Sequence, residues 1–182
     1  MHSLTIFDSC NRMPQQVFDE FFSLMEISFP ATERRDRNGF LWEYENTEFR
    51  SMCSISEHLD AVMNYWDMGD LIYIEHFAVA PELRGRGKGA AMMKEMLSRE
   101  SGKTLVLEAE LPSEGEVAQR RIGFYERLGF KMNEYSYIQP PLIKGEPPVP
   151  LAIMSCPEEL SRESFDHVRE ILYRKVYNIN SK

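Results

Sequence analysis

Arginine, lysine and glycine residues alternate between Arg84 and Gly89, in a stretch that could bind an anion. It follows an apolar segment, residues 71–79, whose β-branched and aromatic side chains predict a mostly buried strand that Pro81 ends. A Met- and Ala-rich segment with helical periodicity comes next. A strand, a glycine-rich turn and a helix in this order place free backbone N–H groups at a helix N-terminus, where the dipole favours negative charge. The stretch therefore predicts a phosphate-binding loop.

The spacing of the glycines decides which phosphate ligand fits this loop. A nucleoside-triphosphate loop needs Gly-Lys followed by Ser or Thr, but Lys88 is followed by Gly89, so no hydroxyl is available for magnesium. The dinucleotide fingerprint needs Gly-x-Gly-x-x-Gly, whereas Gly85, Gly87 and Gly89 alternate with single residues. The spacing therefore excludes both of these loops.

The remaining pattern, Arg84-x-x-Gly87-x-Gly89 directly after a strand, resembles the acetyl-CoA pyrophosphate loop of the GNAT superfamily of N-acetyltransferases. The later segment 124–130, Phe-Tyr-Glu-Arg-Leu-Gly-Phe, strengthens the resemblance. It implies an α/β fold: a mixed, mostly antiparallel twisted sheet with a central parallel strand pair splayed for acetyl-CoA and helices on both faces. It also implies direct acetyl transfer to a primary amine of a small molecule or peptide. The alternative is a non-catalytic acyl-CoA-binding or sensing module of the same fold.

The resemblance also implies which residues hold acetyl-CoA. The main chain of Val79 would pair with the pantetheine amides, and the backbone N–H of Phe77 would meet the oxyanion. The loop backbone would hold the pyrophosphate, with the side chains of Arg84 and Arg86 secondary. The expected cofactor-binding residues are Phe77, Ala78, Val79, Arg84, Gly85, Arg86, Gly87, Lys88 and Gly89.

Acetyl transfer to an amine needs a base, because an amine that titrates near 10.4 is almost fully protonated at pH 7, a handicap of about 4–5 kcal/mol. By the two-residue period of a strand, Glu75 should share a face with Phe77 and Val79, and it is the predicted base. Glu108 is the second candidate, ahead of Glu110, and a water could also relay the proton.

The departing CoA thiolate needs a proton, and Tyr125 matches the position of the family's tyrosine near the cofactor sulfur. Many members carry an Asn seven residues earlier, where this chain has Ala118. Arg120 or Arg121 could replace it by contacting the CoA phosphates, or could be a solvated helix charge. His76 should lie on the opposite face from Glu75, as a packed structural histidine.

The amino-acid composition limits the number of domains, the kinds of partner and the location that we expect for this protein. With 182 residues and 43% hydrophobic side chains, the chain should form a single domain over residues 1–182. A net charge of −8 argues against nucleic acid and favours a cationic acceptor. No long apolar run or signal peptide is present, so we expect a cytoplasmic protein that does not bind membranes. The three cysteines are widely separated, which makes a metal site unexpected, and the family leaves a homodimer open.

The periodicity predicts the elements that position these residues. Strands are expected at 4–7, 49–55, 59–66, 71–79, 104–110, 131–138 and 149–154. Helices are expected at 14–29, 90–101, 116–128 and 161–177, with a shorter one before residue 49. The Pro-rich loop 139–148 could form a wall of the acceptor pocket or be a plain surface connection.

Overall fold

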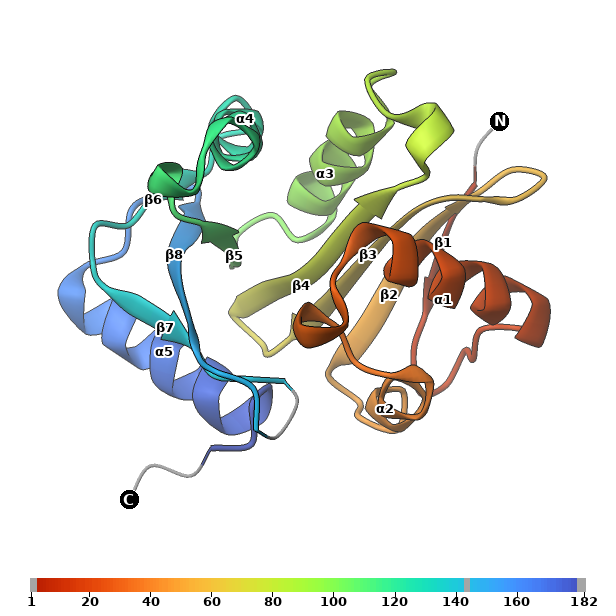
Figure 1. Cartoon of the computed structure of the whole chain (residues 1–182), viewed down its shortest axis with the longest axis horizontal. Helices are drawn as coiled ribbons and strands as arrows, with labels where there is room; N and C mark the ends of the chain where they lie inside the picture. Colours follow the sequence, from red (N-terminus) through yellow and green to blue (C-terminus); the bar gives the residue numbers. More distant parts are fainter. Residues whose placement is uncertain (1–2, 143–144, 180–182) are drawn as a thin grey trace. The chain divides into compact units, whose positions relative to one another are not determined.

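The computed structural model describes residues 3–142 and 145–179 (Figure 1), so part of the predicted loop 139–148 lies outside the described residues. The chain divides into two compact units, Met1–Leu105 and Val106–Lys182. No helix among the described residues is long and apolar enough to cross a membrane.

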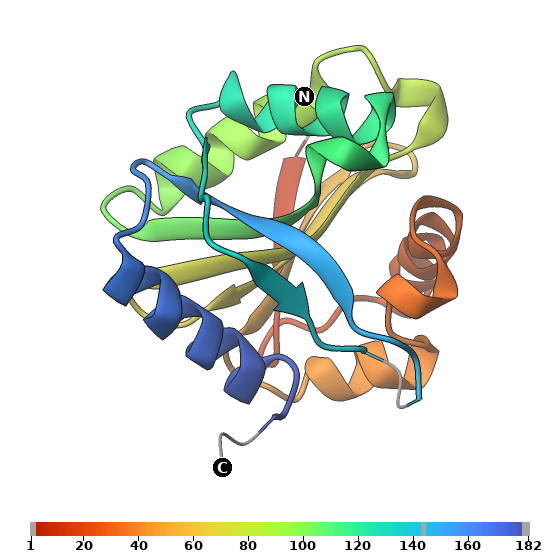
Figure 2. The same ribbon diagram turned by 60° about the vertical axis from the view of Figure 1, so that its left-hand side comes forward.

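The first unit contains an antiparallel sheet in the order β1-β2-β3-β4. Helices α1 and α2 cover one face of this sheet and α3 covers the other (Figure 2). The elements of this unit are β1 (Ser3–Phe7), α1 (Gln15–Ser28), η1 (Ala31–Glu33), α2 (Arg37–Glu43), β2 (Phe49–Ile55), β3 (Leu59–Asp67), β4 (Leu71–Val79), η2 (Pro81–Leu83) and α3 (Lys88–Arg99).

Helical spacing of apolar residues explains how α1 and α3 pack on the sheet. The side chains of Phe18, Phe21 and Met25 recur every three or four residues along α1 and are buried. In α3, the side chains of Met92, Met93 and Met96 follow a helical spacing and are likewise buried. The side chain of Asp36 accepts a hydrogen bond of 2.7 Å from the Gly39 N–H, which caps the short helix α2. The predicted helices and strands of this unit are confirmed, with ends that differ by at most two residues.

The second unit is arranged around β8, which pairs antiparallel with β6 and with β7 and is a neighbour of β5. The chain reaches β5 from β4 through helix α3, the type of connection that a parallel strand pair requires. The elements are β5 (Thr104–Glu110), which begins in the first unit, η3 (Pro112–Glu114), α4 (Glu116–Glu126), β6 (Lys131–Met132), β7 (Tyr137–Gln139), β8 (Val149–Cys156) and α5 (Arg162–Lys175).

The prediction of one continuous strand over 131–138 is wrong, because the chain leaves the sheet at Asn133. The Asn133 side chain is buried and donates to the Ile153 carbonyl (2.9 Å) and to the Ser155 hydroxyl (3.0 Å). Its oxygen accepts from the Leu160 N–H at 2.7 Å. These bonds replace strand pairing and divide the segment into β6 and β7.

Candidate active site

The loop between β4 and α3 has the geometry of an anion-binding site. Gly85 and Gly87 have φ values of 73° and 79°, which favour glycine, and a Cβ at either would meet nothing within 4 Å. Gly87 is the N-cap of α3, and the Ala91 N–H bonds to its carbonyl at 2.9 Å. The N–H groups of residues 88–90 come before this bond and lie at the positive end of the helix dipole. The conformation suits a bound anion.

The Arg84 and Lys88 side chains of the loop bind neighbouring protein groups. The Arg84 guanidinium donates to the Val79 carbonyl (2.9 Å) and to the Ser28 hydroxyl (3.3 Å). The Lys88 ammonium donates to the Asp60 carboxylate at 2.7 Å. Arg84 thus connects the loop to the end of β4, which brings the predicted cofactor residues 77–79 and 84–89 together in the first unit.

Strand β4 contains a β-bulge at Glu75. Tyr65 on β3 pairs with Ile74, and Asn64 pairs with His76, so that Glu75 has no opposite residue. A bulge of this kind places two consecutive side chains on one face of the strand.

The bulge corrects one sequence prediction. Glu75 contacts Arg35, which precedes α2, and the ring of His76 lies 5.8 Å from that of Phe40 in α2. Both side chains therefore face α1 and α2. Phe77 and Val79, which pair with residues 63 and 61 of β3, face the other way. The expectations that Glu75 shares the face of Phe77 and Val79, and that His76 opposes Glu75, are wrong because the bulge reverses the alternation.

Glu75 is part of a buried ion cluster. Its carboxylate lies 3.1 Å from the Arg35 guanidinium and accepts a hydrogen bond of 2.8 Å from the Trp66 indole N–H. Burial alone would raise the pKa of Glu75, but the Arg35 charge and these hydrogen bonds hold it below its usual value. The side chain is 2% exposed, so Glu75 is a weak base with little access to solvent.

Glu43 of α2 shares the same cation. Its carboxylate lies 3.0 Å from the Arg35 guanidinium, and its side chain is 1% exposed. Burial, together with the smaller effect of the Glu75 charge, raises the pKa of Glu43 to about 7, although the Arg35 charge opposes the shift. One guanidinium therefore serves two buried carboxylates, of which Glu43 is the more easily protonated.

His76 is packed in the core next to this cluster. Its Nε2 donates to the Glu33 carbonyl at 3.0 Å, and its ring lies 4.9 Å from that of Phe29. Burial lowers the pKa of His76, although the Glu75 charge opposes this shift. A neutral, packed histidine agrees with the structural role expected from the sequence.

In the second unit, Tyr125 lies on α4 and is 8% exposed. Its ring packs at 5.8 Å from that of Phe130. Burial raises the pKa of Tyr125 to about 12; the nearby Arg121 charge opposes this shift and the Glu110 charge adds to it. The hydroxyl is therefore protonated at neutral pH and able to donate.

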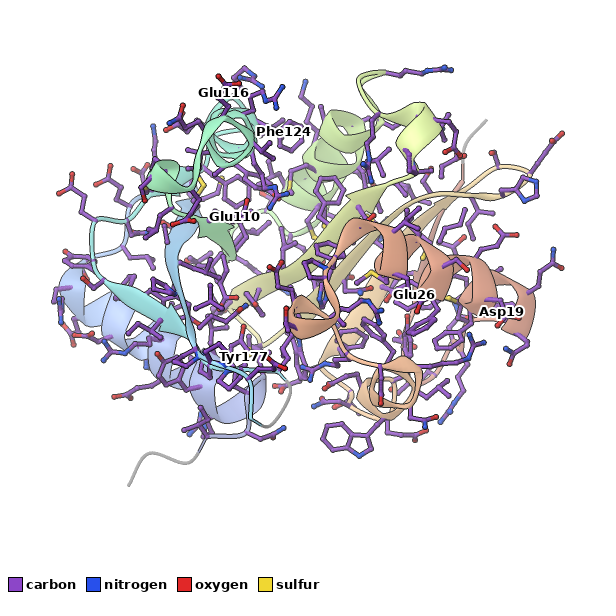
Figure 3. The ribbon with its side chains drawn as sticks, viewed as in Figure 1. Asp19, Glu26, Glu110, Glu116, Phe124 and Tyr177 are labelled. Carbon is purple, nitrogen blue, oxygen red and sulfur yellow. The ribbon has the colours of Figure 1, made fainter. Side chains whose placement is uncertain are left out.

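The two arginines proposed as replacements for the family's Asn differ in their surroundings. Arg121 binds Glu110 at 2.7 Å, whereas Arg120 is exposed on α4. Glu110, the partner of Arg121, lies on β5, and the labels of Glu116 and Phe124 mark α4 (Figure 3). Ala118 is 2% exposed and packs in the core.

Glu108 accepts hydrogen bonds from three neutral side chains of the second unit. The Gln139 amide donates at 2.5 Å, the Tyr177 hydroxyl lies 3.0 and 2.8 Å from the two carboxylate oxygens, and the Tyr137 hydroxyl also donates. The sequence analysis missed these three partners. Alternation places 137 and 139 on one face of a strand, which could have indicated Tyr137 and Gln139, but no pattern pointed to Tyr177.

Comparison with known proteins identifies the family. A model of the acetyltransferase (GNAT) domain matches residues 37–132, and no match was found among curated proteins. A protein from Bacteroides thetaiotaomicron, described as a GNAT-family acetyltransferase, is 28% identical, with a TM-score of 0.86 over 98% of this chain and 99% of its own.

Two more distant structures share the fold. The ribosomal-protein-S18-alanine N-acetyltransferase from Escherichia coli is 17% identical, with a TM-score of 0.60 over 88% of this chain and 97% of its own. An aminoglycoside 6'-N-acetyltransferase complexed with coenzyme A is also 17% identical, with a TM-score of 0.60 over 84% of this chain and 95% of its own. The fold class expected from the sequence is confirmed, and the chain belongs to the GNAT family of acetyltransferases.

Proposed function

We propose that the protein is an N-acetyltransferase that transfers the acetyl group of acetyl-CoA directly to a primary amine of a small molecule or peptide. One GNAT-type domain over residues 1–182 would carry the activity. The observation that carries this proposal is the loop from Arg84 to Gly89, whose glycine conformations and helix N-terminus suit a pyrophosphate. The two distant relatives act on a protein alanine and on an aminoglycoside, so both kinds of acceptor are compatible with the fold.

The backbone N–H groups of residues 85–90 would hold the pyrophosphate, and the residues Phe77, Ala78 and Val79 would bind the pantetheine arm and the thioester. Acetyl-CoA supplies an activated acyl group with a thiolate leaving group. Arg84 fixes the end of β4 against the loop through its bond to the Val79 carbonyl. The two parts of the cofactor site would therefore keep a constant spacing.

The proton of the acceptor amine requires a base, and the structure favours Glu108 over Glu75 for this role. Glu75 is buried, ion-paired with Arg35, and has a lowered pKa. Glu108 is half-buried, and its partners Tyr137 and Tyr177 carry hydroxyls that can either donate or accept. A hydroxyl can turn when the carboxylate takes a proton, so Glu108 would remain hydrogen-bonded in both states.

Tyr125 would protonate the departing thiolate. Its raised pKa keeps the hydroxyl protonated at neutral pH, and its buried ring holds the hydroxyl in place. The neutral amine nitrogen would attack the thioester carbonyl, and the carbon–sulfur bond would break as Tyr125 gives its proton to sulfur. The proton that the nitrogen loses in becoming an amide would pass through water to the tyrosinate, which restores Tyr125. No covalent enzyme intermediate is needed.

Acetyl-CoA binding by isothermal titration, followed by a free-thiol assay across polyamines, aminoglycosides, amino acids and peptides, tests this function. We expect binding and amine-dependent thiol release by the wild type, and loss of release but not of binding in Glu108→Gln. Absence of binding at millimolar acetyl-CoA would refute the proposal. Tight binding without release for any amine would favour the acyl-CoA-sensing module.

A further inference from the structure

Asp60, near the start of β3, contacts both ends of the segment that joins β4 to α3. Its carbonyl accepts a hydrogen bond of 2.8 Å from the N–H of Ala80, the residue that follows β4. Its carboxylate accepts a hydrogen bond of 2.7 Å from the ammonium group of Lys88, the first residue of α3. One residue of β3 is therefore bonded to this segment on both sides of Gly85 and Gly87.

The ion pair between Asp60 and Lys88 is largely buried. The exposed fraction is 6% for the Asp60 side chain and 20% for the Lys88 side chain. The Ser56 hydroxyl, in the turn between β2 and β3, donates to the other oxygen of the Asp60 carboxylate at 3.0 Å. Each carboxylate oxygen thus accepts a hydrogen bond, which fixes the orientation in which Asp60 meets Lys88.

Lys88 occupies a position where a cation is unfavourable for the helix itself. It lies at the positive end of the dipole of α3, and the first turn of this helix contains no acidic residue. The N-cap is Gly87, which has no side chain to bond to the first N–H groups. The Asp60 carboxylate brings a negative charge from the sheet to this helix end, and the contact therefore accounts for a lysine at this place.

We propose that Asp60 is a positioning residue for the phosphate-binding loop, and that it acts through Lys88 and Ala80 without contacting the cofactor. This inference rests on the proposed function. The bonds of Asp60 keep the N–H groups of residues 85–90 in the arrangement that receives the pyrophosphate before acetyl-CoA binds. A loop that is already ordered loses less conformational entropy on binding, so the affinity for acetyl-CoA is higher.

The double variant Asp60→Asn/Lys88→Met is the first test. It removes one negative and one positive charge, so the net charge of the chain stays at its wild-type value. We expect the Kd for acetyl-CoA, measured by titration calorimetry, to rise about tenfold, because the loop must then be ordered on binding. The Kd for S-acetylpantetheine, which lacks the pyrophosphate, should not change.

Two further variants are controls for the ion pair. Lys88→Arg keeps a cation opposite Asp60 and should keep the wild-type Kd for acetyl-CoA. Asp67→Asn/Lys103→Met is the matched control, because it removes an ion pair of 2.9 Å at the other end of β3 and also leaves the net charge unchanged. It should bind acetyl-CoA as the wild type does. Thermal unfolding of each variant checks that it folds.

NMR relaxation of the wild type is a second measurement that needs no variant. The backbone order parameters of residues 80–90 should be about 0.85, a value typical of a rigid backbone, both with and without acetyl-CoA. A segment that becomes ordered only when acetyl-CoA binds would overturn the positioning proposal while acetyl transfer stands.

The calorimetry can also overturn the positioning proposal. A folded double variant with a wild-type or lower Kd for acetyl-CoA would do so, as would one that binds acetyl-CoA and S-acetylpantetheine equally more weakly. A wild type that binds no acetyl-CoA would overturn the proposed function itself, and the positioning proposal with it.

Discussion

Replacement of Glu43 by Gln should make the stability of the protein less dependent on pH. Burial raises the pKa of Glu43 from 4.5 to about 7 in the folded state. Between these two values the folded state binds more protons than the unfolded state. The contribution of Glu43 to stability is therefore fully present below pH 4.5 and is lost as the pH rises through 7.

The size of the effect follows from the two pKa values. Proton linkage with values of 4.5 and about 7 gives a loss of about 2.5 kcal/mol in the free energy of unfolding between pH 5 and pH 8. Gln resembles the protonated acid and cannot ionise, so Glu43→Gln lacks this loss. Urea unfolding at pH 5 and pH 8 gives the change in the free energy of unfolding for the wild type and for the variant. The difference between these two changes is the contribution of Glu43.

Between pH 5 and pH 8, the ionisable neighbours of Glu43 should contribute equally to the pH dependence of stability in the wild type and in the variant. The pKa of Glu75 is lowered, so its carboxylate is ionised in both states above pH 5. The pKa of His76 is lowered in the folded state, so protonation of the unfolded state lowers stability as the pH falls. This effect is the same in the wild type and in Glu43→Gln. Glu45→Gln, at a side chain that is 59% exposed, is the control. The same pH dependence in wild type and Glu43→Gln would refute the assignment of a raised pKa to this buried carboxylate.

Gly87→Val should weaken acetyl-CoA binding about tenfold, because a positive φ costs a residue with a side chain about 1–2 kcal/mol. The loss should be larger than that caused by Arg86→Ala. If titration calorimetry showed the reverse order, the binding site could not be formed mainly by the loop backbone. Tyr125→Phe should lower kcat about 100-fold while the Kd for acetyl-CoA is unchanged, and an unchanged kcat would remove the tyrosine from the mechanism. Arg35→Met should lower stability at pH 8 by about 3–5 kcal/mol, because the charges of Glu43 and Glu75 stay buried without their shared cation. Wild-type stability in denaturant unfolding would argue against that ion cluster.

Local patterns predicted those elements whose ends are set by nearby residues. Strand β4 ends two residues before Pro81, and the glycine-rich loop contains its own turn conformations at Gly85 and Gly87. The break after Asn133 could not be predicted, because its side chain binds groups at 153, 155 and 160. Hydrogen bonds between residues so far apart in the sequence produce no periodic pattern from which the break could be predicted.

The same distinction applies to the candidate site. The loop was recognisable because its chemistry lies within six consecutive residues, 84–89. The partners of Glu75 depend on a bulge, and a bulge depends on the pairing with β3 as well as on the sequence of β4. Tyr177 lies 69 residues from Glu108, so only the folded chain associates them.

The bulge at Glu75 also determines how mutational tolerance should vary along β4. In a saturation mutagenesis experiment on a regular strand, sensitive and tolerant positions alternate with one phase from end to end. Here the phase should reverse between Glu75 and His76, because the pairing shifts by one residue at that point. Deletion of Glu75 would leave Ile74 opposite Tyr65 and His76 opposite Asn64, so a single phase would run along the strand and both halves would keep their faces. A one-residue deletion far from the bulge would instead turn one part of the strand inside out, and it should be more harmful than the deletion of Glu75.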